Sequence, residues 1–250
     1  MRQLKYILKK HSGRSGGKVT VRHQGGRHKR FLRQIDFNRG KMDVWGKVEA
    51  IEYEPNRNAT IALVLYEDGE RRYILAPAGL VVGAKVIASE MAPVEVGNSL
   101  PLKAIPVGTQ VHNIEITKGK GGQIVKGAGS AAVIFGKEEV YVLVKLPSGE
   151  IRRFDPGCFA TIGQVGNVDD RNKNLGKAGR VRNRGKRPSV RGVAMNPHAH
   201  PHGGGEGRSG VGMKFQKTFY GRPAVGKTRN KKKYSNRLIV QSRGGKAVLG

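Results

Sequence analysis

Positive charge is concentrated at the two ends of this chain, and this segregation limits how much of it can form a hydrophobic core. The first 50 residues hold 14 Lys or Arg against 3 Asp or Glu, and residues 171–250 hold 21 against one acid, Glu206. Residues 51–150 hold 10 basic and 11 acidic residues. A segment so charged and so poor in aliphatic clusters cannot bury enough apolar surface to offset its ordering entropy. We therefore expect a globular middle between two extensions that become ordered on a polyanion.

The net charge of +29 over 250 residues identifies the expected class of partner. Such a chain repels itself unless a polyanion neutralises it, so we expect nucleic acid.

The single cysteine, Cys158, favours a reducing compartment, and we expect it to be a small buried hydrophobe. Apolar runs such as Ile61 to Tyr66 are much shorter than the roughly 18 to 20 residues that span a bilayer. We expect neither a membrane partner nor a homo-oligomer.

Short stretches rich in β-branched and aromatic residues recur through the middle of the chain, and they predict two sets of strands. The first set covers 48–53, 59–66 and 71–76, and the second covers 110–116, 131–135, 140–146, 151–154 and 158–165. Asp68-Gly69 predicts a tight hairpin with a primed turn, and residues 147–150 supply a second hairpin turn. The one expected helical segment is a short turn near 169–175.

The fold class is therefore mainly β, with two small barrels in tandem. Closed or nearly closed five-stranded barrels remove exposed sheet edges in sets of about 60 to 70 residues. We predict a basic N-terminal extension over 1–39, a first barrel over 40–102, a second barrel over 103–170 and a basic, glycine-rich C-terminal extension over 171–250.

Two glycine-rich basic loops favour contact with phosphate. Lys118 to Gly122 lacks the spacing and the helix of a nucleotide-binding Walker loop, so we expect either a solvated loop or one that lies on nucleic-acid phosphate. Arg22 to Arg30 alternates cations with a Gly pair, and we interpret it as a phosphate-contacting segment rather than a charged linker.

Three histidines at alternate positions, His198, His200 and His202, raise the alternative of a metal site. We expect neighbouring histidines to diverge along an extended segment that has no rigid surrounding shell, so we disfavour metal binding. No nucleophile or partner carboxylate is placed by a recognisable motif, so we predict no enzymatic activity. Glycines allow the backbone to approach a ligand closely, and His and Arg side chains stack on bases or form hydrogen bonds with them. The segment is therefore predicted to be a loop that threads through folded RNA.

Four stretches carry a resemblance to a known family. They are VRGVAMNPHAHPHGGGEGR (190–208), YEPNRNATIALVLYEDGERRYILAPAGL (53–80), IPVGTQVHNIE (105–115) and KGKGGQIVKGAG (118–129). The chain resembles the universal L2 family of large-subunit ribosomal proteins from about residue 18 to 240. His198-Ala199 stands where Val-Asp is common, and 210–222 lacks the usual proline-tryptophan segment.

The resemblance implies an OB-fold barrel, then an SH3-like barrel, then a long extension. It also implies a structural constituent of the large subunit that binds ribosomal RNA, with tRNA, a small-subunit RNA bridge and other ribosomal proteins nearby. His200 would support the peptidyl-transferase region without being catalytic. We expect a cytoplasmic ribosome of bacterial type, with a mitochondrial or plastid ribosome as the alternative. A nonspecific nucleic-acid condenser or RNA chaperone is the alternative function.

The expected RNA contacts are cations, with one asparagine and several histidines, in the loops and extensions described above. They are Arg22, His23, Arg27, His28, Lys29, Arg30, Arg57, Arg71, Arg72, Lys118, Lys120, Lys177, Arg180, Arg182, Arg184, Lys186, Arg187, Arg191, Asn196, His200, His202, Arg208, Lys227, Arg229, Lys231, Lys232 and Lys233. No cofactor and no protein metal site is expected, and any Mg²⁺ would be associated with the RNA.

Overall fold

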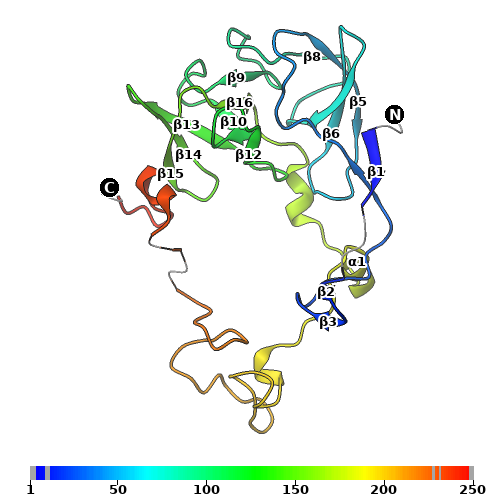
Figure 1. The fold of residues 1–250 in the computed structure, drawn as a ribbon, viewed down its shortest axis with the longest axis vertical. Coiled ribbons are helices and arrows are strands. Elements are labelled where there is room, and N and C mark those ends of the chain that lie inside the picture. Colours follow the sequence, from blue (N-terminus) through cyan, green and yellow to red (C-terminus); the bar gives the residue numbers. More distant parts are fainter. Residues whose placement is uncertain (1–3, 9–11, 227–228, 231, 248–250) are drawn as a thin grey trace. The chain divides into compact units, whose positions relative to one another are not determined.

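The computed structural model describes residues 4–8, 12–226, 229–230 and 232–247, which fall into two compact units. The barrel unit consists of Met1–Leu8, Arg30–Asn174 and Tyr234–Gly250, and the basic unit consists of Lys9–Lys29 and Leu175–Lys233 (Figure 1). This division follows contacts within the chain, and the four segments drawn from the sequence stay predictions.

The first barrel is a curled antiparallel sheet with the strand order β7-β6-β5-β8. Its strands are β5 (Gly46–Glu52), β6 (Ile61–Tyr66), β7 (Arg71–Leu75) and β8 (Lys85–Val86). Strand β6 is buried on both faces, because Leu4 and Ile35 pack beside the outer cluster of Ile61, Leu63 and Tyr73. The two-stranded sheet of β1 (Lys5–Ile7) and β4 (Phe31–Arg33) adjoins this side. Because both faces of β6 are buried, its sequence is a continuous apolar run and does not alternate between apolar and polar residues.

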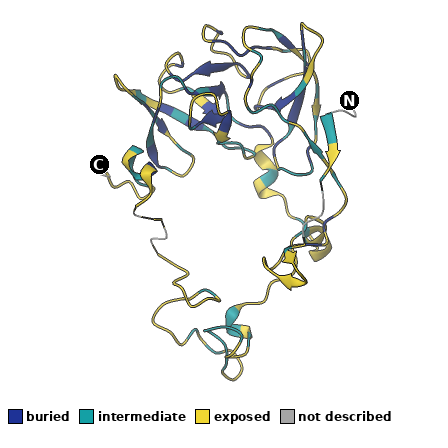
Figure 2. Ribbon diagram, in the orientation of Figure 1, coloured by how far each residue is buried: buried dark blue, intermediate teal, exposed yellow. Residues whose placement is uncertain are grey.

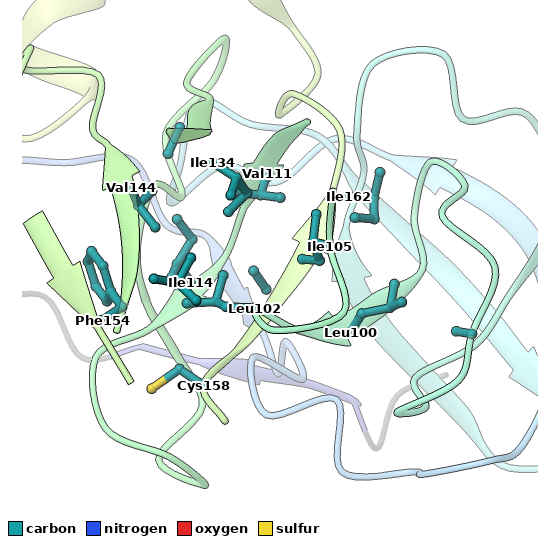
Figure 3. Close-up of a cluster of buried hydrophobic side chains, with 14 of the residues drawn as sticks. Leu100, Leu102, Ile105, Val111, Ile114, Ile134, Val144, Phe154, Cys158 and Ile162 are labelled. Atoms are coloured by element: carbon teal, nitrogen blue, oxygen red, sulfur yellow. The ribbon is translucent and has the colours of Figure 1, made fainter. Parts of the chain in front are cut away.

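The second barrel is a curled seven-stranded sheet with the order β17-β15-β14-β13-β10-β16-β9. Its strands are β9 (Ser99–Pro101), β10 (Gln110–His112), β13 (Ala132–Lys137), β14 (Val142–Lys145), β15 (Ile151–Phe154), β16 (Phe159–Ile162) and β17 (Ile239–Gln241). A short pair, β11 (Ile114–Glu115) and β12 (Gly122–Ile124), adjoins it. Figure 3 shows the core, in which Cys158 is fully buried as expected. Burial raises the pKa of the Cys158 thiol to about 12, and the nearby carboxylates of Asp155 and Glu115 contribute to this shift.

The predicted strands and the mainly β fold class are confirmed, and the architecture is that of an OB-fold barrel followed by an SH3-like barrel. The primed turn predicted at Asp68-Gly69 is wrong, because only Gly69 has a positive φ. The Gly69 amide donates to the Tyr66 carbonyl, and the Tyr66 amide donates to the Glu70 carbonyl. This is a three-residue loop whose last residue is left-handed. The loop before β15 repeats it, with Gly149 in the left-handed position.

Helical structure is short. The expected turn near 169–175 is the 3₁₀ helix η2 (Val168–Asn172), and the structure also contains α1 (Ala178–Asn183), η3 (Gly192–Ala194) and η4 (Tyr234–Leu238). The basic unit also contains the hairpin of β2 (Arg14–Ser15) and β3 (Lys18–Val19), and most of it is exposed (Figure 2). No helix in the described part of the chain is long and apolar enough to cross a membrane.

Candidate nucleic-acid interface

The basic unit is built by pairing the N-terminal segment with residues that follow α1. Gln24 forms an antiparallel bridge with Lys186, and the Gly25 amide donates to the Gly185 carbonyl at 3.0 Å. Gly185 has a φ of +95°, and a Cβ added to it would lie 3.0 Å from the Cβ of Arg27. The two basic extensions, which the sequence presents as separate, therefore share one structural unit.

Positive charge is dense in this unit, whose two segments hold 23 of the 47 Lys and Arg residues and a single acid, Glu206. Arg27 is only 8% exposed because it packs against Gly185. The other predicted contacts of the N-terminal segment and of the region around α1 are exposed: Arg22, His23, His28, Lys29, Lys177, Arg180, Arg182, Arg184, Lys186, Arg187 and Arg191. Cations without nearby acids attract phosphate strongly, since binding releases condensed counterions.

The histidine segment folds back on itself and forms a ring cluster. The centroids of the His200 and His202 rings lie 4.8 Å apart, and the Phe219 ring lies 6.4 Å from His200. The expectation that neighbouring histidines diverge is therefore wrong. The His200 and Ala199 amides both donate to the Asn196 carbonyl, so the segment turns instead of running extended. Residues two apart would share a face even in an extended strand.

Two ring nitrogens of this cluster already accept hydrogen bonds. The His202 amide donates to Nδ1 of His200 at 3.0 Å, and the Lys217 amide donates to Nε2 of His202 at 2.9 Å. The first bond places the proton of neutral His200 on Nε2. Desolvation, and then the nearby His202 and Arg22, lower the pKa of His200, which favours the neutral ring. Across the described residues, no three His, Cys, Asp or Glu side chains converge to hold a metal ion.

Glycines are required where this loop packs on itself. A Cβ on Gly192 would lie 2.6 Å from Nε2 of His200. A Cβ on Gly203 would overlap the Asn196 carbonyl and lie 2.7 Å from the Met195 carbonyl oxygen. The backbone, and not only the side chains, therefore determines where His200 lies.

Gly203→Ala is expected to open the loop while leaving both barrels folded. The added methyl meets backbone carbonyls, which cannot rotate away as a side chain can, at a cost of about 1 to 3 kcal/mol. Hydrogen–deuterium exchange of the RNA-bound protein should be faster over 192–205. Gly210→Ala is the matched control, because nothing lies within 4 Å of its Cβ position and its φ is not positive. Equal exchange in the two variants would contradict the role of Gly203.

In the barrel unit, the loop that carries Lys118 and Lys120 is organised by Glu115. The Glu115 carboxylate is buried and accepts three backbone N–H bonds, from Gly119 at 3.3 Å, Gly121 at 2.8 Å and Phe159 at 3.0 Å. Both lysines remain exposed. The chain thus presents two cations on a shaped backbone, which suits contact with phosphate.

A second basic site surrounds Phe37. The Arg57 guanidinium lies 5.2 Å from the Phe37 ring centroid, and the Lys126 ammonium lies 4.1 Å from it. Desolvation lowers the pKa of both cations, and nearby Arg57 lowers that of Lys126 further. Sequence reasoning missed Lys126 and Phe37, although Lys126 follows Lys118 and Lys120 along one glycine-rich stretch.

Arg71 and Arg72 already have acidic partners within the barrel unit. Arg71 donates to both carboxylate oxygens of Glu49 at 2.8 Å. Arg72 donates to Glu70 at 2.7 Å and to Asp36 at 2.9 Å. Arg72 and then Lys41 lower the pKa of Glu70 to about 2. RNA contact by the two arginines stays a prediction, and their charge is largely neutralised locally.

The remaining predicted contacts lie mostly in the C-terminal extension. Arg30 is half-buried, and its guanidinium donates to the Pro55 carbonyl at 2.7 Å. The predicted residues Lys227 and Lys231 lie outside the described residues. Those that the structure shows as exposed are Asn196, Arg208, Arg229, Lys232 and Lys233.

Comparison with protein families assigns both parts of the chain. Residues 1–88 match the model described as Ribosomal Proteins L2, RNA binding N-terminal domain. Residues 95–221 match Ribosomal Proteins L2, C-terminal domain, so the second match extends from the second barrel into the basic unit. The barrels, the concentrated charge and the two matches agree, and the chain belongs to the L2 family of ribosomal proteins, which are RNA-binding structural components of the ribosome.

Proposed function

We propose that this protein is a primary ribosomal-RNA binder of the large subunit, and that its His200 loop supports the peptidyl-transferase region, tRNA binding and subunit association. The observation that best supports this proposal is that the segment from Met195 to Arg208 is folded around His200, in a unit that holds 23 Lys and Arg residues and one acidic residue. Phosphate neutralisation would supply most of the affinity, and the shape of the folded RNA would supply specificity.

In this proposal His200 positions RNA and performs no chemistry itself. Its neutral ring has Nδ1 committed to the His202 amide. Nε2–H is thereby left as the donor toward a base or phosphate oxygen. We also propose that Mg²⁺ near the site is held by RNA and not by protein ligands, and that the ribosome is of the bacterial type.

Replacing His200 tests the proposal in cells that rely on the variant. His200→Ala should remain in the large subunit through a high-salt wash and density-gradient sedimentation, because the barrels and cations are intact. Peptide-bond formation by those subunits should fall by about tenfold or more, since small misplacements of reacting groups carry costs of that order.

His198→Ala is the matched control, because His198 is exposed and lies two residues earlier. It should behave as the wild type. Wild-type rates of assembly and peptide-bond formation in His200→Ala would overturn the role of the loop. Release of the wild-type protein by modest salt, or by excess unrelated RNA, would instead favour a nonspecific condenser or RNA chaperone.

A further inference from the structure

An exposed aromatic pair lies within the basic unit, whose described residues contribute to none of the buried hydrophobic clusters. Phe219 is 41% exposed and Tyr220 is 80% exposed. Their ring centroids lie 5.3 Å apart in an edge-to-face arrangement. Aromatic side chains usually contribute stability by burial, so two exposed rings in a cationic segment need another explanation.

Phe219 is held between side chains from two distant parts of the chain. The Arg22 guanidinium lies 4.3 Å from its ring centroid, and the His200 ring lies 6.4 Å from it on the histidine loop. His202 extends the row, with its ring centroid 4.8 Å from that of His200. A guanidinium, two imidazoles and two aromatic rings are thus gathered at one place, and each has a planar face able to stack on a base.

The charge around the cluster indicates which kind of molecule would bind there. Arg22 has no acidic partner among the described ion pairs, and Glu206 is the only acid in the unit. An apolar protein surface would leave these cations without an anionic partner, and an acidic protein surface would offer carboxylates to the cations but few flat faces to the rings. An RNA strand offers both phosphates for the cations and π faces for the rings.

We propose that Arg22, His200, His202, Phe219 and Tyr220 form a stacking platform for an unpaired RNA base. The inference deepens the proposed function, because it names the chemical group that the His200 loop would hold, and it rests on that function only for the identity of the RNA.

The test separates stacking from phosphate attraction with two probes. One is an eight-nucleotide single-stranded RNA, and the other is an abasic oligomer with the same length and charge. Fluorescence anisotropy with the full-length chain gives the Kd for each. Phe219→Leu removes the π face and keeps an apolar side chain. It should raise the Kd for the base-bearing RNA roughly 5- to 150-fold and leave that for the abasic strand unchanged.

Phe215→Leu is the matched control. Phe215 is 67% exposed in the same unit, and the Lys214 ammonium lies 5.8 Å from its ring centroid. This variant should bind both probes as the wild type does, and Phe219→Trp should retain affinity for the base-bearing RNA. A 5-bromouracil-substituted strand should photo-crosslink to the peptide that contains Phe219 and Tyr220.

Three results would overturn the platform. They are equal weakening of binding by Phe215→Leu, an equal loss of affinity for both probes in Phe219→Leu, or crosslinking of the 5-bromouracil strand elsewhere in the chain and not to the peptide that contains Phe219 and Tyr220. None of them depends on the proposed function, which is decided by sedimentation and peptide-bond formation with His200→Ala. The platform and the ribosomal role can therefore fail separately.

Discussion

Glu115→Ala is expected to lower the free energy of unfolding of the barrel unit by about 3 to 5 kcal/mol. The carboxylate is 3% exposed and accepts N–H bonds from Gly119, Gly121 and Phe159. Truncation leaves three backbone donors without their acceptor and creates a cavity beside β16. The loss should also disorder the loop that presents Lys118 and Lys120. Urea unfolding of the full-length protein measures the first effect, and RNA affinity at low salt measures the second.

Glu138→Ala is the control for charge. Glu138 is an exposed acid whose carboxylate pairs with the Arg153 guanidinium at 3.1 Å, and a pair of this kind contributes at most about 1 kcal/mol. Both variants gain one unit of positive charge, so any general effect on RNA attraction is shared. If the two unfold at the same urea concentration, Glu115 does not organise the loop.

The strands were predictable from sequence where their own residues carry the signal. Strand β6 is a run of apolar residues buried on both faces, and β14 and β15 flank a glycine turn. Strands β1 and β17 are three residues long and pair with residues far away in the chain, at β4 and β15. Nothing within such short segments distinguishes them from loop, so local pattern could not find them.

The sequence predicted the kinds of residue that make up the candidate site, but not how those residues are arranged in space. The sequence identified the cations and His200, because charge and glycine content are properties of a segment. It did not identify the pairing of Gln24 with Lys186, or the placement of Arg22 on Phe219, because both join segments that only the fold brings together. It also treated Arg71 and Arg72 as available cations, whereas their acidic partners come from neighbouring strands and loops.

Acidification is expected to destabilise the barrel unit through His112. This residue is fully buried, and its Nδ1–H donates to the Gly163 carbonyl at 2.8 Å. Its Nε2 accepts no hydrogen bond from a described residue. Burial, aided by the nearby Arg39 charge, lowers the pKa of His112 from 6.5 to about 4. Protonation would place a second positive charge in the interior.

The sign of the effect follows from proton binding, which is stronger in the unfolded chain than in the folded one. Above pH 6.5, His112 is neutral in both states and contributes no pH dependence. Between pH 6.5 and 4, the free energy of unfolding should fall by about 1.4 kcal/mol per pH unit, a total of about 3 kcal/mol, with no further change from His112 below pH 4. Carboxylates also titrate at the acid end. The informative quantity is therefore the free energy of unfolding of the wild type minus that of His112→Gln, which lacks the titrating ring. Parallel slopes for the two proteins between pH 6.5 and 5 would show that His112 does not cause the loss.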